Sequence, residues 1–292
     1  MWYEYRRAAA QGGEPKKMAE ILILVHRHGS FVKPRYFLHE IAGVWHEAGH
    51  RIKVAQGPAP GARAGAGPAI KADVAVLHVD LTVVPEDHLE YLRQFPVVIN
   101  GQVKDISKRA ISNNILSAGD AYDGPVIIKT DRNYGGIMEA ALAARGLGQR
   151  PTVVWEPKDY PIYQHAREVP AAVWSNPDLV VEKFISERRD GCYCLRTWVF
   201  MGDKETNSLS WANQPIVKSD AVIRREPVAE VPEELREMRR TLGFDFGKFD
   251  YAIVDGRVIL YDANRTPAAG NIPREQYLPR IRLLAEGLRM FL

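Results

Sequence analysis

The chain has 292 residues, of which 46% are hydrophobic and 26% charged, a composition typical of a soluble globular protein with two domains or one large α/β unit. Its net charge of +3, without a long basic block, argues against a nucleic-acid partner. No apolar run approaches the roughly 18 residues of a membrane span, the N-terminus lacks a signal-peptide core, and two cysteines form no disulfide framework. We therefore expect a cytoplasmic protein with no membrane and no nucleic-acid partner.

The first hundred residues have the pattern of a small parallel sheet with flanking helices. Residues 20–25 (EILILV) form a continuous apolar run, which is typical of a strand buried on both faces. Strand-like and helix-like segments then follow up to residue 100, whereas residues 57–69 are rich in Gly, Pro and Ala and predict a loop. The predicted elements are strands at 20–25, 51–55, 73–78 and 96–100, and helices at 34–50 and 86–93.

Polar side chains follow two of these strands. His26 and His28 come directly after the first strand, and Asp80 follows the third. Ligands of parallel sheets bind at the carboxyl ends of the strands, so these side chains are candidates for a substrate site. The alternative is that the two histidines are ordinary loop residues, and the sequence leaves both interpretations open.

A strand and loop at residues 125–136 suggest phosphate binding. Lys129 lies near the end of the strand at 125–130, and Gly135 and Gly136 follow in the loop. A lysine at this place can reach phosphate oxygens, and the backbone N–H groups of a glycine-containing loop can approach them closely. Most Gly-Gly pairs after a strand are simple turns, so the motif is weak by itself.

Several further strands and helices are expected beyond this loop. The strand at 192–201 carries Arg196, and residues 210–225 form either a solvated basic face or a loop that binds an acidic substrate. Residues 151–177 are irregular. Another strand is expected at 179–185, with helices at 137–145, 232–242 and 278–292.

A hairpin near the C-terminus brings together oxygen-bearing side chains. Strand-like runs at 249–254 and 257–262 flank an Asp-Gly pair, which is a strong hairpin signal. Asp250 lies on the first strand, and Asp262 and Asn264 lie on or just beyond the second. Two carboxylates and an amide oxygen on one face would suit a hard cation, although solvent-exposed strand ends are the alternative.

The parity of the hairpin loop decides whether the two acids share a face. Side chains alternate along a strand, so a two-residue turn would place Asp250 and Asp262 on opposite faces. We therefore predict a loop with an odd number of residues, Val254-Asp255-Gly256, in which Gly256 has a positive φ.

Taken in order, these motifs resemble the ATP-grasp superfamily over about residues 21–267. The stretch VIIKTDRNYGG resembles the phosphate strand and its glycine lid, EKFI resembles the adenine-binding hinge, and the last hairpin resembles the metal-binding hairpin with its "N-x-x-P" exit. The resemblance implies an ATP-grasp fold, with two α+β subdomains that grip ATP, over residues 101–292. A small Rossmann-like parallel α/β domain would precede it at 20–100, and residues 1–19 would be an N-terminal extension.

The resemblance also assigns roles to individual residues, with ATP and Mg²⁺ (or Mn²⁺) as cofactors. It implies that Arg196 and Lys129 act in phosphoryl transfer, although Tyr193 or Cys194 replaces the usual acid before the arginine. Lys104 is an alternative to Lys108, and either Glu187 or Asp190 would bind the ribose. The implied metal ligands are Asp250, Asp262 and Asn264, and the implied nucleotide contacts are Lys108, Lys129, Gly135, Gly136, Glu182, Lys183, Phe184 and Ile185.

Most of the superfamily are ligases, so the resemblance implies that ATP phosphorylates a substrate carboxylate and that an amine then attacks the acyl-phosphate. The expected partners are small-molecule or peptide carboxylates and amines, and the expectations include a homodimer. An ATP-grasp kinase and a nucleotide-binding protein without turnover are the two alternatives.

Overall fold

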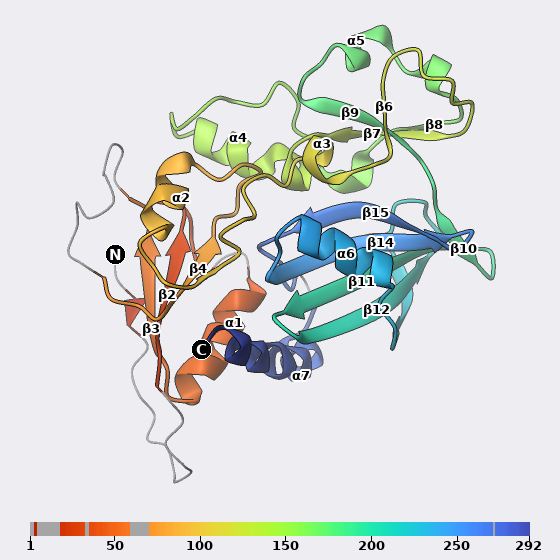
Figure 1. The fold of residues 1–292 in the computed structure, drawn as a ribbon. Helices are drawn as coiled ribbons and strands as arrows, with labels where there is room; N and C mark the ends of the chain where they lie inside the picture. The colour runs from red at the N-terminus through yellow and green to blue at the C-terminus, as the bar shows by residue number, and fades with distance from the viewer. Residues whose placement is uncertain (1–2, 5–17, 33–34, 59–69, 271) are drawn as a thin grey trace.

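The computed structural model describes residues 3–4, 18–32, 35–58, 70–270 and 272–292. Within this part of the chain, helices surround three β-sheets, one mainly parallel and two antiparallel (Figure 1). The predicted mixed α/β architecture is therefore confirmed. The loop predicted at 57–69 lies outside the described residues except for Gly57 and Pro58, as does most of the segment at 1–17.

A mainly parallel sheet occupies the N-terminal part of the chain. Its unit consists of β1 (Tyr3–Glu4), β2 (Glu20–Val25), α1 (Phe37–Glu47), β3 (Arg51–Gln56), β4 (Val74–His78), α2 (Glu86–Leu92) and β5 (Val98–Ile99). The strand order is β1-β3-β2-β4-β5, and all strands except β1 run parallel. Residues 1–19 were expected to be an N-terminal extension, but Tyr3 and Glu4 pair with the edge of β3.

Helices cover both faces of this sheet, which explains why its central strands are apolar on both sides. α1 packs on one face together with the C-terminal helix α7 (Arg274–Ala285), which is followed by the 3₁₀ helix η4 (Glu286–Phe291). The Trp45 indole N–H donates to the carbonyl of Ala285 at 2.8 Å and joins these two helices. Leu89 and Leu92 of α2 pack on the opposite face.

The second sheet is antiparallel, with the order β6-β9-β7-β8. Its unit consists of α3 (Lys108–Ile111), β6 (Ile115–Leu116), β7 (Val126–Thr130), η1 (Asn133–Gly136), α4 (Ile137–Ala143), η2 (Pro157–Asp159), β8 (Ile162–Tyr163), η3 (Ala166–Glu168), α5 (Ala171–Trp174) and β9 (Leu179–Lys183). Val126, Ile128 and Val181 face an apolar cluster that also includes Trp174. Because side chains alternate, Lys129 and Glu182 point from the other face of this sheet.

The third sheet is also antiparallel. Its unit consists of β10 (Glu187–Arg189), β11 (Cys192–Met201), β12 (Lys204–Ala212), β13 (Val222–Pro227), α6 (Glu233–Thr241), β14 (Phe246–Val254) and β15 (Arg257–Asn264). The order is β13-β12-β11-β14-β15, and β10 pairs with β11. Helix α6 packs on one face through Leu235, against Trp198 and Phe249. In Figure 1 the chain passes from β9 in the upper sheet to β10 in this lower sheet.

Three strands of the third sheet, β10, β12 and β13, were not predicted. Residues 210–225 were expected to be a basic face or a loop, but they include the end of β12 and the start of β13, where Arg225 donates to the Ser210 hydroxyl at 2.9 Å. Cys194 is buried beside Leu209, and both cysteines are free thiols, as expected. Among the described residues, no helix has the length and apolar character needed to cross a membrane.

Candidate functional site

The hairpin of β14 and β15 brings Asp250 and Asp262 together by a different route from the predicted one. The prediction of a loop with an odd number of residues is wrong, because Val254 pairs with Arg257 across a two-residue turn. Both turn residues have a positive φ, 50° at Asp255 and 76° at Gly256, so the conformation predicted for Gly256 is confirmed.

A β-bulge places Asp250 and Asp262 on the same face of the sheet despite the two-residue turn. The register shifts between Asp250 and Tyr251, and Tyr251 pairs with Leu260 while Asp250 pairs with Asp262. Tyr261 is therefore the extra residue, and a single extra residue moves every following side chain to the other face. Asp250 and Asp262 face each other directly, and Asn264 lies on the same face opposite Lys248.

Each carboxylate of this pair is held by a lysine. Lys108 donates to Asp262 Oδ1 at 2.5 Å, and Lys248 donates to Asp250 Oδ2 at 2.7 Å. Burial by itself would raise the pKa of Asp262, but the nearby charges of Lys108 and Lys248 lower it. The Thr197 hydroxyl donates to Asp250 Oδ1 at 3.0 Å and helps to orient that carboxylate.

The second sheet contributes a further lysine, Lys129, and a glutamate, Glu182, next to the hairpin of β14 and β15. Lys129 on β7 donates to Glu182 Oε2 at 2.6 Å and lies 3.5 Å from the carbonyl oxygen of Tyr261, so it spans the two antiparallel sheets. Lys129 and Glu182 are 8% and 2% exposed. We use the name inter-sheet site for the set Lys108, Lys129, Glu182, Lys248, Asp250 and Asp262.

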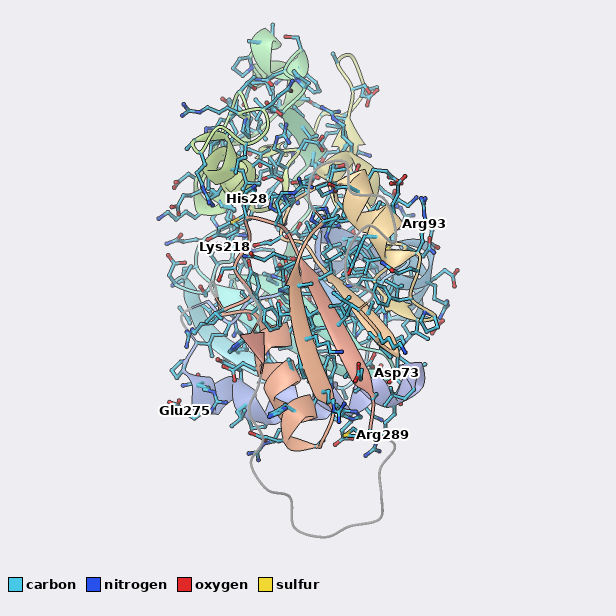
Figure 2. All side chains as sticks on the ribbon, turned by 90° about the vertical axis from the view of Figure 1, so that its left-hand side faces the viewer. His28, Asp73, Arg93, Lys218, Glu275 and Arg289 are labelled. Carbon is cyan, nitrogen blue, oxygen red and sulfur yellow. The ribbon has the colours of Figure 1, made fainter. Side chains whose placement is uncertain are left out.

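Lys218 adds a further cation beside the inter-sheet site. It lies on the loop between β12 and β13, and Figure 2 shows it on the same edge of the molecule as His28. Burial of the ammonium lowers the pKa of Lys218, and the negative charge of Asp250 acts in the opposite direction. Part of the Lys218 side chain is exposed to solvent. Lys104 is exposed, whereas Lys108 is 4% exposed and bound to Asp262, so Lys108 is the lysine that the fold brings to the site.

The two glycines after β7 are required by the backbone. Gly135 and Gly136 have φ angles of 71° and 75°, in the left-handed region that favours glycine. A Cβ atom on Gly135 would lie 1.7 Å from the carbonyl oxygen of Trp155. This packing accounts for Gly135, and the role of the loop in phosphate binding stays a prediction.

The segment expected to form the adenine hinge connects two sheets. The backbone N–H groups of Lys183 and Phe184 donate to the carbonyls of Asn114 and Pro125 at 2.9 and 2.8 Å, and the Tyr261 hydroxyl donates to the carbonyl of Ile185. Of the side chains, Glu182 points to the inter-sheet site, whereas the Lys183 ammonium lies over the Tyr122 ring.

Arg196 and Glu187 lie on the other face of the third sheet. Arg196 pairs with Tyr251, the neighbour of Asp250, so alternation turns its side chain away from the two acids. Its guanidinium donates to both carboxylate oxygens of Glu187, at 2.8 and 2.9 Å, and Glu187 Oε2 also accepts from the N–H of Ile253. Asp190 lies in the exposed turn between β10 and β11. The structure therefore does not bring these three side chains to the inter-sheet site.

Arg196→Met is expected to lower the free energy of unfolding by about 1.5–3 kcal/mol, because it removes the charged hydrogen bonds from Arg196 to Glu187, which keeps those from Arg189 and from the N–H of Ile253. ATP affinity should stay within about twofold. Chemical denaturation and calorimetry measure the two effects, and Arg167→Met, which breaks an exposed pair with Asp123, should change stability by no more than about 1 kcal/mol. A tenfold loss of ATP affinity at unchanged stability would instead indicate that Arg196 contacts the nucleotide.

The donor set at the hairpin fits a magnesium ion bound together with phosphates. Mg²⁺ is usually held by one or two carboxylates plus substrate phosphates, and Asp250 and Asp262 supply two facing carboxylates. Asn264 Oδ1 accepts from both the N–H and the hydroxyl of Thr266, at 2.7 and 3.1 Å, so its oxygen is already engaged. Among the described residues, no cluster of three or more His, Cys, Asp or Glu could hold a metal ion.

The histidines after β2 line a separate pocket. His26, His28 and Asp80 border a cavity of about 210 Å³, and a role of these residues in substrate binding stays a prediction. The sequence did not single out His78, which lines the same pocket, or Lys248 and Thr197. It placed the fully buried Arg265 only in the exit from the last strand. Arg265 donates to the carbonyls of Val79, Leu81, Thr82 and Val103, and it joins the end of β15 to the N-terminal unit.

No family model and no curated protein matches this sequence. Similar solved structures include a RiPP-associated ATP-grasp ligase from Chryseobacterium gregarium in complex with ADP and a leader and core peptide, at 8% identity and a TM-score of 0.51, covering 92% of this chain and 97% of that one. A RimK domain ATP-grasp protein from Sphaerobacter thermophilus is similar at 12% identity and a TM-score of 0.48, with 92% and 98% coverage. The ATP-bound D-alanine–D-alanine ligase of Bacillus anthracis is similar at 14% identity and a TM-score of 0.45, with 94% and 99% coverage. The chain has the ATP-grasp fold.

Proposed function

We propose that the chain is an ATP-dependent ligase that joins a carboxylate to an amine, or to a similar nucleophile, and releases ADP and phosphate. One observation carries this proposal: two lysines from different elements meet at the hairpin between the two antiparallel sheets. Lys108 donates to Asp262, which faces Asp250, and Lys129 lies 3.5 Å from the carbonyl oxygen of the neighbouring Tyr261. The Chryseobacterium gregarium ligase of the same fold holds ADP with a leader and core peptide, which supports a nucleotide and either a small-molecule or a peptide substrate.

Binding of ATP would exchange the ion pairs of the inter-sheet site. Without nucleotide, the lysines neutralise Asp262, Asp250 and Glu182. In our proposal the phosphates take over Lys108 and Lys129, and the carboxylate of Asp262, released from Lys108, would hold Mg²⁺ together with Asp250. Bound there, Mg²⁺ would neutralise phosphate charge. Both lysines would keep anionic partners in the phosphates, whereas Glu182, which is 2% exposed, would lose the ammonium of Lys129.

The remaining contacts follow from the two sheets. The adenine would lie beside residues 182–185, where the chain crosses from β9 to β10, and the loop with Gly135 and Gly136 would cover the phosphates. We include neither Arg196 nor Glu187 nor Asp190 among the nucleotide contacts.

The proposed reaction has two displacements. A substrate carboxylate oxygen attacks the γ-phosphorus, the bond to the leaving ADP oxygen breaks, and an acyl-phosphate forms. The amine nitrogen then attacks the acyl carbon, the carbon–oxygen bond to phosphate breaks, and the departing phosphate takes up the proton lost from nitrogen. Phosphoryl transfer needs mainly positioning and charge neutralisation, which buried lysines supply.

Incubation with ATP, Mg²⁺, hydroxylamine and a panel of amino-acid and short-peptide carboxylates tests this proposal. We expect a hydroxamate, because hydroxylamine traps an acyl-phosphate, and the Asp262→Asn variant serves as the negative control. A stable phosphorylated product without hydroxamate would indicate a kinase. Binding of ATP without either product would indicate a protein that does not turn over, and both results would contradict the ligase.

A further inference from the structure

A pocket outside the inter-sheet site has the features of a built ligand site. It measures about 210 Å³ and opens at the carboxyl ends of β2 and β4, the edge where parallel sheets bind ligands. Helix α4 of the second unit forms its opposite wall with Met138, Ala141 and Leu142. None of the residues that define the inter-sheet site lines it.

His78, the last residue of β4, is the buried polar group of this pocket. It is 2% exposed and packs edge-on against the rings of Phe31 and Tyr36, at 5.6 and 4.7 Å between centroids. Burial lowers the pKa of His78 to about 3, so the ring is neutral and offers one donor and one acceptor. Neither ring nitrogen has a hydrogen-bond partner among the described residues. Buried polar groups are normally paired, so this ring indicates a ligand that can pair with it.

Charges in the pocket favour an amine inside and an anion at the rim. Asp80 is the interior carboxylate, and Tyr36 donates to its Oδ2 at 2.6 Å. Burial raises the pKa of Asp80, while the hydrogen bonds from Tyr36 and Thr266 favour its charged form, as a bound ammonium would. Burial lowers the pKa of His26 to about 4, so its imidazole adds no positive charge. Among the described lining residues, the lysine or arginine is Arg145, an exposed residue just after α4 that donates to the carbonyl of His28 at 3.5 Å.

The pocket is connected to the end of the strand that carries Asp262. The Thr266 hydroxyl lies 2.7 Å from Asp80 Oδ1 and 3.1 Å from Asn264 Oδ1. Arg265, which lies between Asn264 and Thr266 in the chain, donates to the carbonyls of Val79 and Thr82 and so fixes that segment. A group bound at Asp80 is therefore held close to the end of β15, where the proposed acyl-phosphate would form.

We propose that this pocket binds the nucleophile of the ligation as a primary α-amine on an apolar residue, either a free amino acid or the N-terminal residue of a peptide. The amine pairs with Asp80 and His78, the apolar side chain packs against Met138 and Leu142, and a free carboxylate, where present, meets Arg145. The identification of the occupant as the nucleophile rests on the proposed function, whereas the binding itself can be measured without ATP.

Calorimetry without nucleotide tests the binding with L-leucine, L-methionine and L-phenylalanine, their amides, and 4-methylpentanoate, which has the carbon skeleton of leucine without the amine. We expect at least one of the amino acids or amides to bind, and 4-methylpentanoate to bind at least about tenfold more weakly. Tighter binding of the acid than of its amide identifies a free amino acid, and equal binding identifies a peptide N-terminus. Binding of none of these amines, or equal binding of 4-methylpentanoate and leucine, would overturn the proposal.

Two variants locate the binding. His78→Phe keeps the ring and its edge-on contacts but removes both nitrogens, so we expect at least about tenfold weaker amine binding. Ala141→Trp fills the pocket from an exposed position on α4 and should also abolish it. His165→Phe, at a partly exposed histidine near Asp123, is the matched control and should have no effect. Unchanged amine binding in both pocket variants would overturn the assignment.

ATP affinity, measured on the same proteins, separates this proposal from the proposed function. Both pocket variants should bind ATP like the wild type. Amine binding in a protein that does not bind ATP would contradict the ligase and leave the pocket in place, whereas ATP binding without amine binding would contradict the pocket alone.

Discussion

Asp262→Asn should reduce ATP turnover by about 100-fold or more while the variant still folds. Loss of one preorganised electrostatic group at a reacting centre typically costs about 10²–10³ in rate. Asp262 faces Asp250 across the hairpin and is one of two carboxylates proposed to hold Mg²⁺. ATP hydrolysis measured over a range of Mg²⁺ concentrations checks this prediction, and the dependence on Mg²⁺ should be weakened as well.

The same variant should be less stable without nucleotide. If the two facing carboxylates only repelled each other, neutralising Asp262 would relieve this repulsion and raise the melting temperature of the variant. However, Asp262 is paired with Lys108, whose side chain is 5% exposed, and the variant leaves that ammonium without its partner. The loss should be smaller than the about 3–5 kcal/mol of a fully buried pair, because 27% of the Asp262 side chain is exposed.

Asp255→Asn is the matched control for Asp262→Asn. Asp255 belongs to the same hairpin but lies in its exposed turn with a φ of 50°, which asparagine also adopts readily. It should leave turnover and stability unchanged. If Asp262→Asn kept the activity of the wild type and its thermal shift with Mg·ATP, Asp262 would have no part in the mechanism.

Lys129→Ala should weaken ATP binding about 10- to 150-fold. A hydrogen bond from a charged group contributes about 1.5–3 kcal/mol, which corresponds to that range of affinity. In the nucleotide-free protein the same ammonium neutralises Glu182, which is 2% exposed, so the variant should also be less stable. Calorimetry with ATP and Mg²⁺ measures the affinity, and thermal unfolding measures the stability.

Lys104→Ala is the comparison for Lys129→Ala. Lys104 is an exposed lysine on the segment that leads to α3, and its removal should change neither quantity appreciably. Equal ATP affinity of Lys129→Ala and the wild type would make Lys129 a purely structural partner of Glu182.

Local patterns in the sequence predicted most of the N-terminal unit. The strand expected at 20–25 is β2 with the same bounds, and the helix expected at 86–93 is α2 (Glu86–Leu92). These elements follow from apolar runs and helical spacing, which a single segment contains. By contrast, β12 and β13 depend on pairing with β11, which lies elsewhere in the chain, and their own sequences carry a weaker signal.

The sequence identified most residues of the candidate site, but it did not predict how the strands place them. Asp250, Asp262, Lys108 and Lys129 were identified from short motifs, and the fold brings them together. The bulge at Tyr261 was not foreseen, because a register shift leaves no local signature in the sequence. Likewise, only the pairing of β11 with β14 shows that Arg196 shares a face with Tyr251 and not with Asp250.

A crystal structure with a non-hydrolysable ATP analogue and Mg²⁺ tests the central claim most directly. We predict the phosphates beside Lys108 and Lys129, the metal ion beside Asp250 and Asp262, and the adenine beside residues 182–185. The distance from the Lys108 ammonium to Asp262 Oδ1, which is 2.5 Å without nucleotide, should increase as the ion pair exchanges. An analogue bound elsewhere, with the pairs Lys108–Asp262 and Lys129–Glu182 intact, would contradict the proposal that the inter-sheet site binds ATP.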